Sequence, residues 1–164
     1  MTALRLSRIA LVATVALFFS LVGLGNVVDY GSNFAFVQHV LTMDTTFRAP
    51  ALMGRAITDP TLHHAAYVLI IAWEILTALL LWFGAARLWA ARAAPRRAYL
   101  AARGPAILGL TAGFLLYGAG FIAIGGEWFA MWQSPTWNGQ RAAAIFLLLI
   151  GVALLHLCGP EEEE

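Results

Sequence analysis

A single acidic residue, Glu74, lies within a long apolar stretch of the sequence. If this stretch is a helix that enters a membrane near Ala65, a rise of about 1.5 Å per residue places Glu74 roughly 14 Å deep. That depth is close to the middle of a hydrocarbon core about 30 Å thick. Because an acidic side chain is costly to place there, we expect it to face the interior of a helix bundle. Glu74 is therefore the most informative single residue for function.

Other polar residues are expected to share the interior with Glu74. Residues spaced by three and four positions lie on one helix face, and this spacing links His64, Tyr67 and Ile71 to Glu74. The candidate partners at equal depth on other helices are Ser20, Thr111 and Tyr117. The set has two interpretations, which the sequence leaves open. It is either a proton relay or polar contact to a quinone-like ligand, or a hydrogen-bond clamp between helices.

The histidines are weak candidates for a metal site. Imidazole together with carboxylate suits zinc or copper, and His39, His63 and His64 could meet at one end of a bundle. However, no HxxxH spacing is present, so the default interpretation is interfacial histidines without a metal. A haem held by two histidines is excluded, because His156 is expected about 22 Å from the depth of His63 and His64. We expect no cofactor and, in the absence of any nucleophile or zinc-protease motif, no catalytic residues.

Residues 126–140 form the most distinctive segment, because three tryptophans and a methionine occur within ten positions. They are either a lid that docks on a short helix at 34–41, or a surface that binds a partner protein. The residues expected to bind a partner are Trp128, Phe129, Trp132 and Trp137. Ser134 or Thr136 is expected to cap the helix that follows.

The composition indicates an integral membrane protein. Of 164 residues, 61% are hydrophobic and 12% are charged, whereas a soluble domain typically carries about 25% charged residues. Apolar runs near 20 residues long are typical of membrane-spanning helices. A net charge of +1 gives no support to nucleic-acid binding. The predicted spans are 9–28, 64–84, 105–125 and 141–158.

The predicted fold is an all-α membrane protein with four transmembrane helices and amphipathic or irregular outer connections. Residues 1–160 form one domain, and residues 161–164 form an acidic tail that we interpret as a solvated end. Within the first outer connection, Phe34, Val37 and Val40 have the spacing of a short amphipathic helix. Asp59 followed by Pro60 is typical of a helix start.

The arginines predict the orientation. The amino-terminal segment and the 84–104 connection carry seven of the ten basic residues, all of which are arginine. Short loops rich in basic residues stay in the cytoplasm, so both termini are expected to be cytoplasmic. Tryptophans near both ends of the predicted spans fit the aromatic belts of a membrane protein.

Long segments of the chain resemble a known family. They are residues 29–41, 43–47, 63–67, 72–74 and 126–140. These segments resemble a bacterial family of predicted small integral membrane proteins of unknown function. The resemblance covers nearly the whole chain and implies a four-span protein of the bacterial inner membrane. It implies no activity and no ligand residues.

Three functions remain open on the sequence alone. The favoured one is a non-enzymatic structural or accessory subunit that binds a larger membrane complex through the tryptophan segment. The second is a small carrier or quinone- or proton-handling module centred on Glu74. The third is a metal-binding protein of the outer face. Besides the lipid bilayer, the possible partners are a larger membrane complex and a second copy of the chain.

Overall fold

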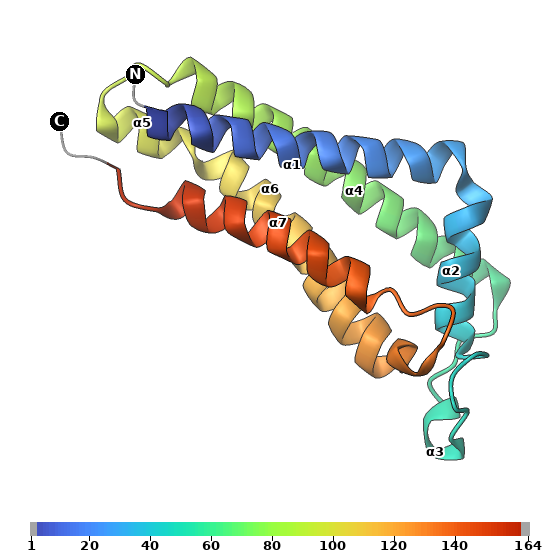
Figure 1. Ribbon diagram of the computed structural model, residues 1–164. Coiled ribbons are helices and arrows are strands. Elements are labelled where there is room, and N and C mark those ends of the chain that lie inside the picture. Colours follow the sequence, from blue (N-terminus) through green and yellow to red (C-terminus); the bar gives the residue numbers. More distant parts are fainter. Residues whose placement is uncertain (1–2, 162–164) are drawn as a thin grey trace.

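The computed structural model describes residues 3–161, and all regular elements of that part of the chain are helices. Two helices, α1 and α4, run side by side, and α6 and α7 pack beneath them (Figure 1). The elements in chain order are α1 (Ala3–Val28), α2 (Tyr30–Thr42), α3 (Pro50–Met53), α4 (Pro60–Ala90), α5 (Arg96–Ala102), α6 (Gly104–Leu115), the π-helix η1 (Leu116–Trp128), the 3₁₀ turn η2 (Met131–Gln133) and α7 (Gln140–Cys158).

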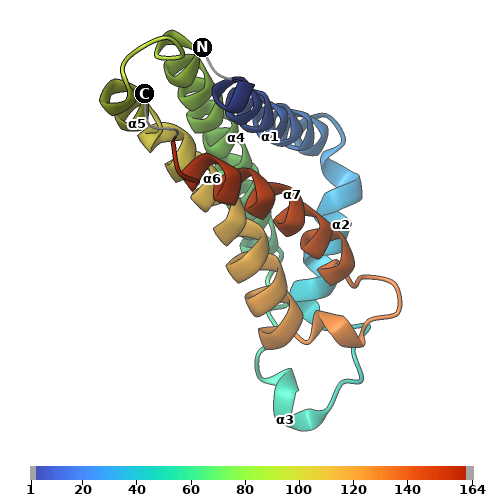
Figure 2. The same ribbon diagram turned by 60° about the vertical axis from the view of Figure 1, so that its left-hand side comes forward.

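Four helices are long and apolar enough to cross a membrane, which confirms the predicted fold class. They are Ala3–Val28, Pro60–Ala90, Arg96–Trp128 and Gln140–Cys158. Each contains one of the four predicted spans. Both ends of the described chain and α5 lie at one end of the bundle, whereas α3 lies at the other (Figures 1 and 2). We call these the terminal end and the α3 end.

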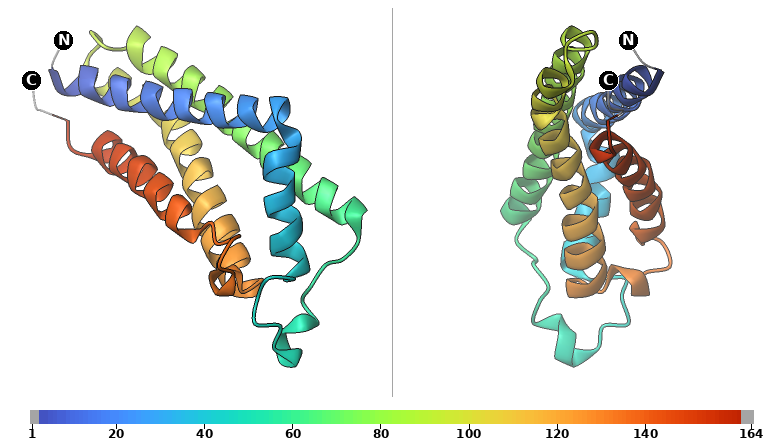
Figure 3. Two further views of the ribbon diagram at one scale, coloured as in Figure 1. Left: turned by 45° about the vertical axis from the view of Figure 1, so that its right-hand side comes forward. Right: turned by 90° about the vertical axis from the view of Figure 1, so that its left-hand side faces the viewer.

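Local signals explain where the helices begin and bend. The Asp59 carboxylate accepts a hydrogen bond of 2.8 Å from the Thr61 amide, and Pro60 occupies the first turn of α4. This confirms the helix start expected from the sequence. Residue 29 separates α1 from α2, and α2 leaves α1 at a steep angle to cross the α3 end (Figure 3). The helix expected around residues 34–41 is therefore present as part of α2.

The helices approach closely at small residues. A Cβ atom on Gly84 of α4 would lie 2.6 Å from the backbone nitrogen of Ala106 in α6. A Cβ on Gly109 would lie 2.8 Å from the side chain of Leu81. These glycines therefore serve packing within the bundle, because a larger side chain would force α4 and α6 apart.

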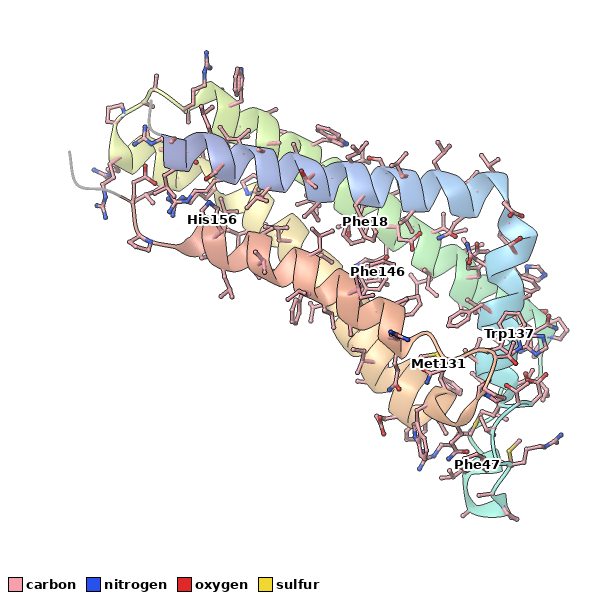
Figure 4. The ribbon with its side chains drawn as sticks, in the orientation of Figure 1. Phe18, Phe47, Met131, Trp137, Phe146 and His156 are labelled. Carbon is pink, nitrogen blue, oxygen red and sulfur yellow. The ribbon has the colours of Figure 1, made fainter. Side chains whose placement is uncertain are left out.

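Aromatic rings fill the centre of the bundle. Phe18 of α1 and Phe146 of α7 face each other with ring centroids 4.9 Å apart (Figure 4). Tyr117 of η1 lies 4.9 Å from Phe146 and 5.9 Å from Phe19. This cluster separates the polar residues at the two ends of the molecule.

Interpreting the acidic tail as a solvated end is wrong for Glu161, which is only 7% exposed. Its carboxylate pairs with Arg5, Arg8 and Arg103 at the terminal end. Burial alone would raise the pKa of Glu161, but the hydrogen bond and charge of Arg5 and the charges of the other two arginines lower it overall. The net attraction explains why this residue is buried. Residues 162–164 of the predicted tail lie outside the described chain.

Candidate functional site

A chain of hydrogen bonds holds Glu74 near the middle of α4. Glu74 is 2% exposed, and its Oε2 accepts a hydrogen bond of 2.7 Å from the Asn26 side-chain amide. Asn33 of α2 donates to Asn26 Oδ1, also at 2.7 Å. The Tyr67 hydroxyl donates to the Asn26 backbone carbonyl at 3.4 Å. Three helices, α1, α2 and α4, are thus joined through one polar cluster.

This polar cluster borders a cavity of about 240 Å³. Besides apolar side chains from all the surrounding helices, the lining includes Asn26, Asn33, Tyr67, Glu74 and Tyr117. Within residues 3–161, the Tyr117 hydroxyl and Glu74 Oε1 have no hydrogen-bond partner. The cavity therefore combines an unused hydroxyl donor with an unused carboxyl oxygen.

A second, apolar cavity of about 250 Å³ lies next to the polar one. The two cavities share Phe36, Val37, Ile70 and Phe121 in their linings. The remaining lining residues of the second cavity are aliphatic, aromatic, glycine or methionine side chains of α2, α4 and the η1–η2 segment. Together the two cavities can accommodate a molecule that is polar at one end and apolar along the rest.

The π-helix η1 presents Tyr117 to the cavity. α6 changes to π-helical geometry at Leu116, and the Phe129 amide still bonds to the Ile124 carbonyl, five residues earlier, at 3.0 Å. A π-helix is rare and often occurs at functional sites, because its wider turn changes the direction of the side chains. Tyr117 lies in the first turn of this segment.

The structure brings some of the predicted interior residues together and separates others. Tyr67, Glu74 and Tyr117 line one cavity. Ser20 does not join them, since its hydroxyl donates to Ala16 and accepts from Trp82 Nε1 at 3.0 Å. Thr111 is exposed on the outer surface of α6. Neither of these two is a partner of Glu74, because the helices turn them away from the cavity.

Asn26 and Asn33 are the site residues that sequence reasoning missed. Asn26 lies at the end of the first predicted span, and Asn33 lies in the helix that follows. An amide side chain near the end of an apolar helix is a usable signal, because it needs a hydrogen-bond partner once it is buried. The bend between α1 and α2, which brings both amides over Glu74, could not be deduced from residue spacing.

The two adjacent histidines at the start of α4 have different environments. His63 is 1% exposed, and its Nε2 donates to the Ile57 carbonyl at 2.8 Å. His64 is exposed, contrary to the expected inward face, and its Nδ1 lies 2.8 Å from the Tyr30 hydroxyl. Its ring stacks on Phe34 with centroids 4.1 Å apart. His63 therefore takes the buried position expected for His64.

His39, the third histidine at the α3 end, has yet another partner. Its Nδ1 lies 2.7 Å from an Asp44 carboxylate oxygen. Within residues 3–161, no group of three histidine, cysteine or acidic residues is close enough to hold a metal ion. His156 lies at the terminal end, 2.8 Å from the Ser7 hydroxyl and far from Trp137 of the α3 end (Figure 4).

The tryptophan segment packs on elements of the α3 end. Trp137 stacks on His39 with centroids 4.6 Å apart, so the segment docks on α2. Phe129 is 6% exposed and belongs to an apolar cluster with Met43. Trp128 and Trp132 are about half exposed, although Trp128 lies beneath the Arg55 guanidinium and Trp132 meets Phe47 edge-on.

The expected cap of the last helix is wrong. Gly139 precedes α7, and the side chain that accepts from the first amide of that helix is Asn138, whose Oδ1 lies 3.1 Å from the Gln140 nitrogen. The Ser134 hydroxyl instead accepts hydrogen bonds from the amides of Thr136 and Trp137, at 3.3 and 2.8 Å. Ser134 thus closes a turn within the tryptophan segment, because the chain needs several more residues to reach α7.

Comparison with known proteins supports the membrane assignment. A family model described as "Predicted small integral membrane protein (DUF2165)" matches residues 4–160. No curated protein and no solved structure matches the chain. Because the match spans almost the whole sequence and four helices can cross a membrane, the chain belongs to this family of small integral membrane proteins.

Proposed function

We propose that this protein binds a lipid-soluble molecule with a hydrogen-bonding head group, of the quinone class, in the cavity beside Glu74. The observation that carries the proposal is the unused donor and acceptor pair in that cavity, Tyr117 and Glu74. A quinone carbonyl accepts a hydrogen bond, and the hydroxyl of the reduced quinol donates one. The head group can therefore use both protein groups.

The apolar cavity favours a ligand with a hydrocarbon tail. It adjoins the polar cavity through shared lining residues such as Phe36 and Phe121. A tail placed there removes apolar surface from water or lipid and leaves the head group beside Glu74. Ligand sites are commonly apolar pockets with a few polar groups that fix the orientation.

An accessory subunit remains the second candidate. It is favoured by the exposure of Trp128 and Trp132, at 54% and 48%, because tryptophan is enriched in protein interfaces. Both rings already contact other residues of the chain, and tryptophans near a membrane surface also serve as anchors. Purification in mild detergent tests this function. A stoichiometric partner lost on Trp128→Ala supports it, whereas a chain purified without any partner contradicts it.

We also propose that the terminal end faces the cytoplasm of a bacterial inner membrane. Seven of the ten arginines lie in the segments of that end. The test uses Cys158→Ser with a single new cysteine at Ala98 or Thr136, both exposed. In intact cells, an impermeant maleimide should label the cysteine at position 136 and not that at 98. The reverse pattern would invert the orientation.

The binding proposal is tested with a short-chain benzoquinone and the purified full chain. We expect saturable binding, measured by quenching of tryptophan fluorescence. Tyr117→Phe removes only the free hydroxyl, and the loss of one hydrogen bond should weaken binding about two- to tenfold. Glu74→Leu should weaken binding of the hydroquinone form of the same probe, because it removes the carboxyl oxygen that accepts from the quinol hydroxyl.

Tyr99→Phe is the matched control. Tyr99 is another buried tyrosine whose hydroxyl has no partner in the described chain, but it lies at the terminal end. Its substitution should leave quinone affinity unchanged. Absence of saturable binding, or equal losses for Tyr117→Phe and Tyr99→Phe, would refute the proposal.

A further inference from the structure

Three buried arginines meet at the terminal end. Arg5 and Arg8 come from α1, and Arg103 lies between α5 and α6. Their exposed fractions are 4%, 1% and 5%. We call these three residues the arginine triad. Arginines are almost never fully buried unless they are paired, so the triad needs an anionic partner.

Glu161 supplies one such partner. Its Oε1 accepts from Arg5 Nε at 2.6 Å, and its Oε2 accepts from Arg103 at 2.6 Å and from Arg8. Other guanidinium N–H groups of Arg8 and Arg103 donate to carbonyl oxygens that follow α7, including that of Gly159. Three cationic side chains thus converge on the two oxygens of one carboxylate.

The cluster contains more donors than this carboxylate uses. The Arg103 Nε and the Tyr99 hydroxyl are both buried, and neither has a hydrogen-bond partner among residues 3–161. The Tyr99 ring belongs to the same cluster, since the Arg5 and Arg103 guanidinium carbons lie 4.5 and 5.3 Å from its centroid. A phosphate group offers more acceptor oxygens than a carboxylate and binds arginine in a bidentate manner.

The position of the triad also favours a phosphate group. It lies between membrane-spanning helices at the arginine-rich end of the molecule. Basic pockets in this position bind anionic lipid head groups. Among the residues that the structure describes, Glu161 is the acidic residue that pairs with the triad, and the other acidic residues lie near the α3 end or, like Glu74, inside the bundle.

We infer that the arginine triad is a binding site for a phosphate group and that the Glu161 carboxylate occupies it as an internal competitor. The phosphate is carried by an anionic phospholipid or is free in solution. The Glu161 side chain must leave before the phosphate binds, and the same arginines then hold the new anion. This inference does not depend on the quinone proposal, because the two sites lie on opposite sides of the aromatic centre.

The test measures binding to the full chain in detergent micelles. The probes are phosphatidylglycerol, phosphatidylcholine and inorganic phosphate. Glu161→Gln removes the competing charge and keeps a similar shape, so phosphatidylglycerol should bind about tenfold more tightly than to the wild type. Phosphatidylcholine should show no such gain, because its head group has no net charge.

Two further variants have equal net charge and test whether the triad itself forms the binding site. In the Glu161→Gln background, Arg103→Lys should abolish the gain, because lysine lacks the planar fork that binds phosphate. Arg97→Lys is the matched control at an exposed arginine of the same end and should preserve the gain. If Glu161→Gln does not fold, the same two lysine variants are compared in the wild-type background.

Each result decides the inference. If Glu161→Gln gains affinity for phosphatidylglycerol alone, the ligand is a lipid head group. If it gains affinity equally for inorganic phosphate, the phosphate comes from solution. Equal binding of the two lipids, equal affinity in wild type and Glu161→Gln, or equal losses for Arg103→Lys and Arg97→Lys would overturn it.

Discussion

Replacing Asn26 with leucine should show how strongly the polar cluster stabilises the bundle. The substitution removes the amide that donates to Glu74 at 2.7 Å, while the carboxyl group remains buried at 2% exposure. Loss of a partner for a buried polar group costs about 1–3 kcal/mol. Hydrogen bonds between membrane helices average nearer 0.6 kcal/mol, so we expect the free energy of unfolding to fall by about 1–2 kcal/mol.

A double-mutant cycle separates this hydrogen bond from general packing. Glu74→Met removes the carboxyl group and leaves the Asn26 amide without its acceptor. Asn26→Leu together with Glu74→Met replaces both partners by apolar groups, which can be nearly neutral. The double variant should therefore be more stable than the sum of the two single losses predicts, by about 1 kcal/mol.

Reversible unfolding in mixed micelles measures each variant. Thr111→Val combined with Glu74→Met is the control pair, because Thr111 is exposed and faces away from the cavity. That pair should be additive within about 0.3–0.5 kcal/mol. If the losses of unfolding free energy for Asn26→Leu and Glu74→Met are as additive as those of this control pair, the proposed coupling is refuted.

Three other predictions follow from single contacts. Gly84→Ala should lower stability by about 1–3 kcal/mol in the same unfolding assay, because its Cβ would lie 2.6 Å from Ala106. The control Gly25→Ala should be tolerated, because its Cβ would meet no atom within 4 Å. Trp137→Ala should lower the melting temperature by loosening the contact with α2 and increase proteolysis of the loop before α4. Because the folded-state pKa of Glu161 lies below its unfolded value, its contribution is complete above the ordinary glutamate pKa and is lost as the pH falls through the lower folded value. The melting temperature should thus decline below about pH 4, and Glu161→Gln should flatten that decline.

Hydropathy was sufficient to predict the four-helix architecture. Apolar length and the Asp59–Pro60 signal depend on residues close in sequence, so the spans and the start of α4 could be found without three-dimensional contacts. The presence of a short helix at the α3 end also followed from local spacing. The change from α6 to the π-helix η1 could not be predicted from local spacing, since Tyr117 is positioned by packing between helices.

The candidate site was predictable only in part. The depth of Glu74 along its helix identified it as an interior residue, and Tyr117 was found by the same argument. Depth does not determine the rotation of a helix, which is why Ser20 and Thr111 were wrong as partners. The burial of Glu161 was missed for a different reason, because it depends on arginines about 60 to 160 residues away in sequence.

Chemical analysis of the lipids that remain bound to the protein tests the central claim most directly. The wild-type chain and Glu74→Leu should be purified in mild detergent, and the organic extracts should be compared by mass spectrometry. We predict a quinone-class molecule in stoichiometric amount with the wild type and its loss from Glu74→Leu. Identical extracts that contain only bulk phospholipids would contradict a ligand site beside Glu74.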